Sequence, residues 1–92
     1  MDARDFADLL RAEGFTETLT RSLPPGQAVP EHTHAFDAKL LVTEGAFTLT
    51  RDGQATTHGP GDVFSVPAGH RHAELAGPKG ADYIAGRRHK PA

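Results

Sequence analysis

The apolar residues near the start of the chain follow the spacing of a helix. Over residues 3–13 they form one narrow stripe, made of Phe6, Leu9 and Leu10. Asp2 or Asp5 can cap the start of this helix, and Gly14 stands where a glycine commonly ends one. Because so short a helix is marginally stable alone, we expect residues 1–14 to form an amphipathic helix that docks on another element.

From residue 15 onward, apolar and polar residues alternate, which is typical of strands with one buried face. The clearest alternating sets are Phe15, Leu19 and Leu23, and then Ala38, Leu40 and Val42. Residues rich in Gly, Pro and Asp predict turns at 24–26, 44–45, 52–53, 59–62, 67–69 and 76–80. Short strands at regular intervals favour an antiparallel, all-β sandwich or barrel over residues 15–88, followed by a tail at 89–92.

The composition is that of one small globular domain, with 92 residues of which 37% are hydrophobic. Cysteine is absent, which excludes disulfides, thiolate zinc sites and iron–sulfur clusters. Ten basic and 12 acidic residues give a net charge of −2. This balance provides no concentrated cationic face for nucleic acid, and we interpret Arg87, Arg88 and Lys90 as a solvated tail.

The sequence also carries no membrane or export signal. Its apolar runs are far shorter than the roughly 20 residues of a membrane helix. The acidic N-terminus is followed by no apolar stretch of the kind that secretory signals contain. We therefore expect a cytoplasmic protein that contacts neither membranes nor nucleic acid.

Histidine is the unusual residue of this chain, with six copies beside one tyrosine and no tryptophan. His32 and His34 are two residues apart, so in an extended segment their side chains share a face and can reach one metal ion. His70 and His72 follow the predicted turn at 67–69, and one imidazole from this pair would complete a three-histidine site. Solvated histidines are the alternative interpretation of either pair.

Two spaced motifs contain these histidines. The first reads Gly26-x5-His32-x-His34 and is followed by Gly45, and the second reads Gly61-x5-Pro67-x-Gly69-x2-His72. Together they resemble the two conserved motifs of the cupin superfamily, over roughly residues 20–76. The resemblance implies a double-stranded β-helix, or jelly-roll, barrel preceded by a short N-terminal helix. It also implies that His32, His34 and His72 hold one divalent transition metal, namely Fe, Mn, Ni, Cu or Zn.

The two motifs lack two residues of the family pattern, one of them a carboxylate ligand. The family usually places a glutamate ligand where this sequence has Ala38, and an asparagine where it has Ala76. Alternation places the adjacent Asp37 on the face away from the metal, unless a bulge turns the strand. Glu74 shares a face with His72 in a regular strand, where it can orient that imidazole or accept a proton, or simply lie at the surface.

These features predict a small pocket beside the histidines. The side chains expected to line it are Phe36, Ala38, Leu40, Phe47, His70 and Glu74. For His70 two interpretations remain: it contacts a substrate, or it is simply exposed at the mouth of the barrel.

The leading hypothesis is a metal-binding, single-domain cupin that carries out an oxygen-dependent, dioxygenase-like oxidation or an isomerisation of a small organic molecule. The pattern assigns no catalytic residue. The alternatives are a non-enzymatic module that binds or senses a small ligand, and a degenerate barrel whose three histidines merely hydrogen-bond to each other or to water. A homodimer is also expected, because the apolar face that bears Phe15, Leu41 and the helix needs covering.

Overall fold

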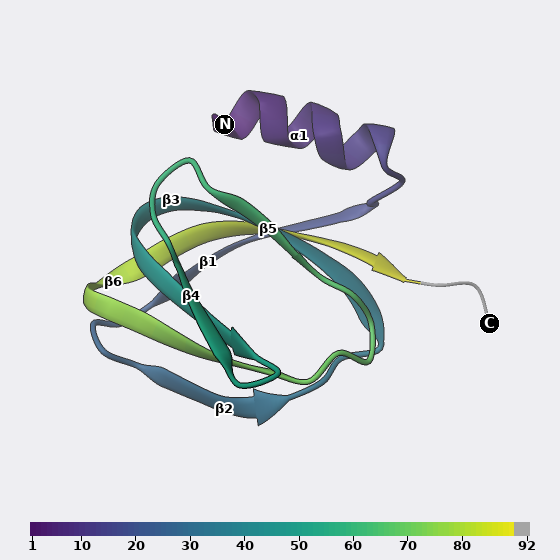
Figure 1. Ribbon diagram of the computed structural model, residues 1–92. Helices are drawn as coiled ribbons and strands as arrows, with labels where there is room; N and C mark the ends of the chain where they lie inside the picture. Colours follow the sequence, from purple (N-terminus) through teal and green to yellow (C-terminus); the bar gives the residue numbers. More distant parts are fainter. Residues whose placement is uncertain (90–92) are drawn as a thin grey trace.

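The computed structural model describes residues 1–89 and shows one short helix outside a curled antiparallel sheet (Figure 1). In chain order the elements are α1 (Ala3–Ala12), β1 (Glu17–Leu23), β2 (Ala28–His32), β3 (Phe36–Arg51), β4 (Gln54–His58), β5 (Val63–Val66) and β6 (His72–His89). The strands pair in the order β1-β6-β3-β4, while β2 also pairs with β6 and β5 also pairs with β3. The predicted all-β barrel with a short N-terminal helix is thereby confirmed.

Two long strands, β3 and β6, form the frame of the barrel and pair with each other along most of their lengths. The turn predicted at 44–45 and the loop predicted at 76–80 are wrong, because each lies inside one of these strands. The chain bends there without leaving the sheet. Gly45 has a φ of +77° and Gly80 a φ of +82°, and the pairing of β3 with β6 shifts register on both sides of Gly45. Bulges of this kind let a strand turn a corner while its hydrogen-bonded ladder continues.

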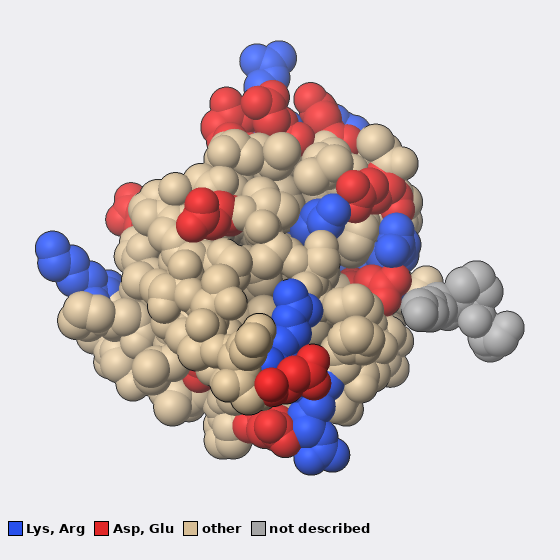
Figure 2. Space-filling model, in the orientation of Figure 1, with Lys and Arg blue, Asp and Glu red and all other residues tan. Residues whose placement is uncertain are grey.

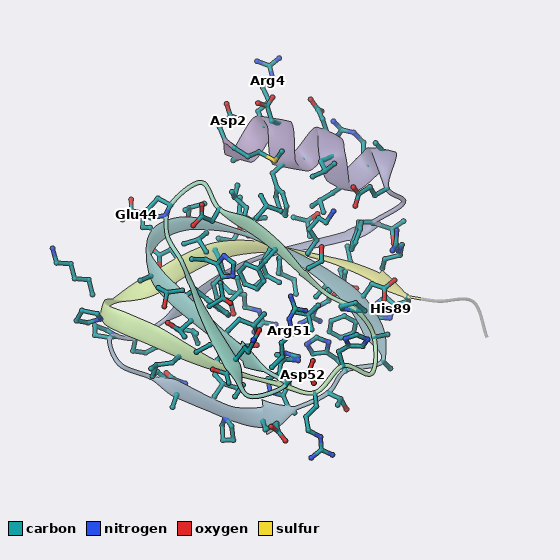
Figure 3. The ribbon with its side chains drawn as sticks, viewed as in Figure 1. Asp2, Arg4, Glu44, Arg51, Asp52 and His89 are labelled. Carbon is teal, nitrogen blue, oxygen red and sulfur yellow. The ribbon has the colours of Figure 1, made fainter. Side chains whose placement is uncertain are left out.

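The hairpin predicted at 52–53 is confirmed, and it joins β3 to β4 with Arg51 opposite Gln54. Figure 3 labels Arg51 and Asp52 at this hairpin. Both turn residues have positive φ, +52° at Asp52 and +76° at Gly53. This is the backbone of the two-residue turn that matches the twist of the flanking strands, and it explains the preference for aspartate followed by glycine.

The helix α1 covers the outer apolar face of the barrel. The carboxylate of Asp2 accepts a hydrogen bond from the backbone N–H of Asp5 at 2.8 Å and caps the helix. Phe6 and Leu10 are buried, and they form one cluster with Phe15 and Leu41. The face that motivated the expected homodimer is therefore covered within the chain itself. The homodimer stays a prediction, which gel filtration at micromolar concentration decides.

The basic residues near the C-terminus are part of the sheet, which corrects their interpretation as a solvated tail. Arg87 and Arg88 lie in β6, and their guanidinium groups approach Glu17 at 3.3 Å and Asp37 at 3.0 Å. The strand reaches His89 because it pairs with β1 on one side and with β3 on the other. Lys90 lies outside the described residues.

Charged side chains on the molecular surface are mixed in sign. On the face that Figure 2 shows, acidic groups gather over α1, and basic and acidic groups lie next to one another elsewhere. Within the described residues, no helix has the length and apolar character needed to cross a membrane.

Candidate metal centre

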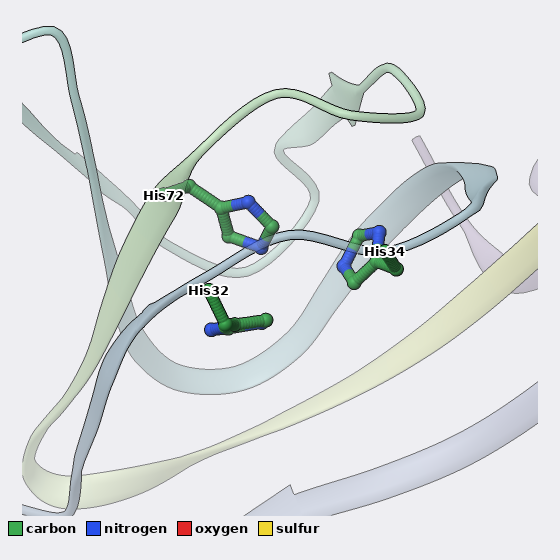
Figure 4. A group of neighbouring side chains, drawn as sticks. All are labelled: His32, His34 and His72. Atoms are coloured by element: carbon green, nitrogen blue, oxygen red, sulfur yellow. The ribbon is translucent and has the colours of Figure 1, made fainter.

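Pairing of β2 with β6 brings the histidines of the two motifs together. His32, the last residue of β2, lies opposite His72, the first residue of β6, and His34 follows β2 in the next loop. The three side chains approach one another from their two chain segments (Figure 4). Each offers a ring nitrogen within 4.8 Å of the other two, so the three-histidine group can hold a metal ion.

Backbone carbonyls orient two of the three rings. Nδ1 of His32 lies 2.8 Å from the carbonyl oxygen of Pro30, and Nδ1 of His72 lies 2.9 Å from that of His70. A carbonyl oxygen can only accept, so Nδ1 carries the proton in each ring and donates it. In the neutral form of each ring, Nε2 then presents its lone pair. Metal-binding histidines are commonly fixed in this way, by a hydrogen bond from the nitrogen that does not bind the metal.

The third ring, that of His34, is held in its neutral form. Burial is the main cause that lowers its pKa below the ordinary value of 6.5, and the neighbouring His72 adds to the effect. The ring stacks on Phe36, with centroids 4.4 Å apart. Its Nδ1 is buried and makes no hydrogen bond of normal geometry. A weaker interaction with the backbone of Phe36 raises the pKa of the ring and offsets part of the lowering. Neutral imidazole is the form that binds metals.

The lowered pKa of His34 predicts how the metal-free protein responds to acid. The unfolded chain takes up a proton at this histidine near pH 6.5 while the folded chain does so only at lower pH. Stability from this group is thus fully present above pH 6.5 and is lost as pH falls through the folded-state pKa. Urea denaturation of the metal-free protein between pH 7.5 and 5 should show this loss, with a smaller slope in His34→Gln than in wild type. Equal slopes in the two proteins would contradict the prediction.

Glu74 lies beside the histidines. Its Oε2 is 3.3 Å from Nε2 of His72 and 3.7 Å from Nε2 of His32, and its side chain is 15% exposed. When both rings are neutral, those two nitrogens present lone pairs, and an ionised carboxylate can only accept. Three acceptors therefore face one another with no donor between any two of them. A cation among them removes this repulsion, so the residues fit a bound metal ion.

Asp37 forms structural hydrogen bonds away from the three histidines. One carboxylate oxygen accepts from the backbone N–H of Ala68 at 2.9 Å, and the other accepts from Arg88 at 3.0 Å. Asp37 thus lies among residues outside the histidine group, as alternation along β3 predicts for the neighbour of the inward-facing Ala38.

A cavity of about 190 Å³ opens beside the three histidines. Four of the six expected pocket residues line it, namely Phe36, Ala38, Leu40 and Glu74. Phe47 instead is fully buried in the core, where the rings of Phe64 and Tyr83 pack against it at 5.2 Å. His70 is exposed in the turn before β6 and lines a separate surface hollow with Arg51.

Besides apolar side chains, three polar residues line the cavity but are absent from the expected pocket: Arg21, Tyr83 and Arg87. Arg21 shares its alternation phase with Leu19 and Leu23, and a charged residue between these two apolar ones is the signal that could have identified it. Burial, followed by the charge of Glu74, raises the pKa of Tyr83 above its ordinary value of 10.0, although Arg21 and Arg87 oppose the shift. Tyr83 therefore keeps its proton at neutral pH.

Solved structures of known proteins share this architecture. An RmlC-like cupin from Shewanella frigidimarina has a TM-score of 0.70 and 24% identity, over 80% of this chain and 66% of its own. KdgF from a Halomonas species has a TM-score of 0.65 and 24% identity, over 79% and 69% of the two chains. A cupin-2 domain containing protein from Shewanella frigidimarina has a TM-score of 0.66 and 18% identity, and here the match spans 96% and 94%. At these identities the likeness shows the fold.

The sequence itself matches one family model. No curated protein matches the chain, but the model described as the cupin domain matches residues 19–77, which include all three histidines and Glu74. That range is more than half of the 92 residues. The chain therefore belongs to the cupin family.

Proposed function

We propose that this cupin binds one divalent transition metal through His32, His34 and His72, with Glu74 as the fourth donor, and acts on a small organic molecule in the adjoining cavity. The observation that carries the proposal is the approach of the Glu74 carboxylate to two imidazole lone pairs, at 3.3 and 3.7 Å. Two ligands that each lie about 2.1 Å from one ion are roughly 3.0–3.4 Å apart at angles of 90–110°. The observed distances are close to that range.

The donor set suits several metals. Imidazole binds Fe, Mn, Ni, Cu and Zn, and a carboxylate is acceptable to each of them. An ion bound there would supply Lewis-acid chemistry, which an isomerisation requires, or electron transfer, which an oxidation requires.

The walls of the cavity select the molecule that enters. Phe36 and Leu40 present apolar surface, while the protonated phenol of Tyr83 can donate a hydrogen bond to a bound oxygen atom. The cavity volume of about 190 Å³ is smaller than the roughly 300–1,000 Å³ of pockets for drug-sized ligands. We therefore infer a substrate of only a few carbon atoms.

Metal content tests the proposal directly. Purified wild-type protein, loaded with each of the five metals in turn and then desalted, should retain close to one ion per chain by mass spectrometry. His34→Ala should lose that ion, because it removes one of three imidazoles. His70→Ala is the matched control and should retain it, since the side chain of His70 lies outside the cavity. Wild-type protein that stays empty with every metal would refute the proposal.

A non-enzymatic ligand-binding module is the second candidate. Among the described residues that line the cavity, Glu74 is the one carboxylate, and the proposed metal site already uses it. No second carboxylate then remains there for acid–base catalysis. A thermal-shift screen of small metabolites, run with a parallel test for turnover and oxygen uptake, separates the candidates. Stabilisation without turnover favours the binding module, and turnover favours the enzyme.

A further inference from the structure

Two arginines line the same cavity as the histidines, each on a strand of the barrel wall. Arg21 of β1 lies opposite Tyr83 of β6 in the strand pairing, and Arg87 of β6 lies opposite Ala38 of β3. Arg21 and Tyr83 therefore share one face of the sheet, as do Arg87 and Ala38. Both arginines thus belong to the inner wall that also carries Glu74.

The charges of these arginines are only partly balanced. Arg87 approaches Glu17 at 3.3 Å and lies over the ring of Phe36, with its Cζ 4.5 Å from the centroid. Arg21 has no ion-pair partner among the described residues. Glu74 is the single acidic group on the cavity wall in this part of the chain, and it lies against the histidines. With Arg87 paired to Glu17, the charges of Arg21 and Glu74 balance each other before a metal ion binds, and a divalent ion then makes the cavity positive.

Space for an anion adjoins one of these arginines. Ala38, the partner of Arg87 in the β3–β6 pairing, lines the cavity with a single methyl group. The planar guanidinium donates paired hydrogen bonds that match the two oxygens of a carboxylate. Phe36 and Leu40 add apolar wall next to these donors, which suits the carbon skeleton of an organic acid better than an inorganic anion.

We infer that the cavity binds a small carboxylic acid whose carboxylate pairs with Arg87 and Arg21 while another of its oxygens faces the metal site. This inference rests on the proposed function and adds the substrate class to it. Tyr83, which is protonated at neutral pH and lies next to Arg21, is placed to donate a hydrogen bond to the same ligand.

Calorimetric titration of the zinc-loaded protein tests the inference. The probes are lactate and malate, their uncharged amides lactamide and malamide, and inorganic phosphate. At least one acid should bind ten or more times as tightly as its amide. Arg21→Gln and Arg87→Gln should each weaken that binding at least tenfold, since each removes a hydrogen bond between charged groups. Arg71→Gln is the matched control, because Arg71 lies outside the cavity and pairs with Glu31, and the affinity of this variant should equal that of wild type.

Each other outcome has one meaning. Acids that bind no better than their amides, or an affinity unchanged by Arg21→Gln, would overturn the inference. Phosphate bound more tightly than both acids would overturn the assignment of a carboxylic acid as the ligand. Arg21 is exposed, so its variant should fold even if Arg87→Gln does not, and circular dichroism checks both.

Zinc content, measured on the same samples, separates this inference from the proposed function. Bound zinc with no preference for acids refutes the inference alone. Absent zinc refutes the metal site, and arginine-dependent binding of an acid by the metal-free protein would still support the carboxylate subsite.

Discussion

Gly45→Ala should lower the free energy of unfolding by more than about 3 kcal/mol, since positive φ alone costs roughly 1–2 kcal/mol at a residue with a Cβ. The φ at Gly45 is +77°, and a Cβ there would overlap with the backbone carbonyl of Gly80 on the paired strand. Neither backbone can retreat without breaking the β3–β6 ladder at its bend. Because small domains are stabilised by only about 5–15 kcal/mol, urea denaturation should show a large loss or an unfolded chain.

Gly69→Ala is the matched control for backbone strain. Its φ is +78°, and no atom lies within 4 Å of the position where its Cβ would stand. This variant should therefore lose only the conformational cost, about 1–2 kcal/mol. Equal losses at Gly45 and Gly69 would show that the contact between the two bends contributes nothing.

Glu74→Gln should change metal affinity and metal-free stability in opposite directions. The change removes the negative charge proposed to bind the ion, so metal affinity should fall at least 100-fold, beyond the roughly 10–100-fold that losing a partner of a ligand costs. Without metal, the introduced amide can donate a hydrogen bond to Nε2 of a neutral His72, whereas the ionised carboxylate of wild type has no proton to donate to it. The metal-free variant should therefore be at least as stable as metal-free wild type.

Competition with a chromophoric chelator measures the affinity, and urea denaturation in a chelating buffer measures the stability. The absorption spectrum of the cobalt-loaded protein distinguishes a lost ligand from a displaced one, because it reports coordination geometry. Glu31→Gln is the control, since its carboxylate is exposed and pairs with Arg71. An unchanged affinity and cobalt spectrum in Glu74→Gln would remove Glu74 from the proposed donor set.

The predictions from sequence succeeded where local chemistry decides the structure. The cap at Asp2, the turn at Asp52 and Gly53, and the shared face of His32 and His34 each depend on residues within a few positions of one another. Such features follow from local backbone geometry, which the types of neighbouring residues determine directly.

The errors arose where distant segments decide the structure. The bends of β3 and β6 stay in the sheet because each long strand has partners far away in sequence, and the same pairing draws Arg87 out of the predicted tail. Alternation gives the face of a strand but not the depth along the barrel. It therefore placed Phe47 in the pocket rather than in the core. The proximity of Glu74 to His32 likewise depends on the pairing of β2 with β6.

Tyr83 gives the cavity an optical reporter of its own. It is the one tyrosine of a chain that has no tryptophan, and it lines the cavity wall beside the proposed ligand. Every photon of phenol fluorescence, and the whole absorbance change on phenolate formation, therefore originates at this wall. Occupancy of the cavity can be followed in unlabelled protein, without a fluorophore that would crowd so small a space.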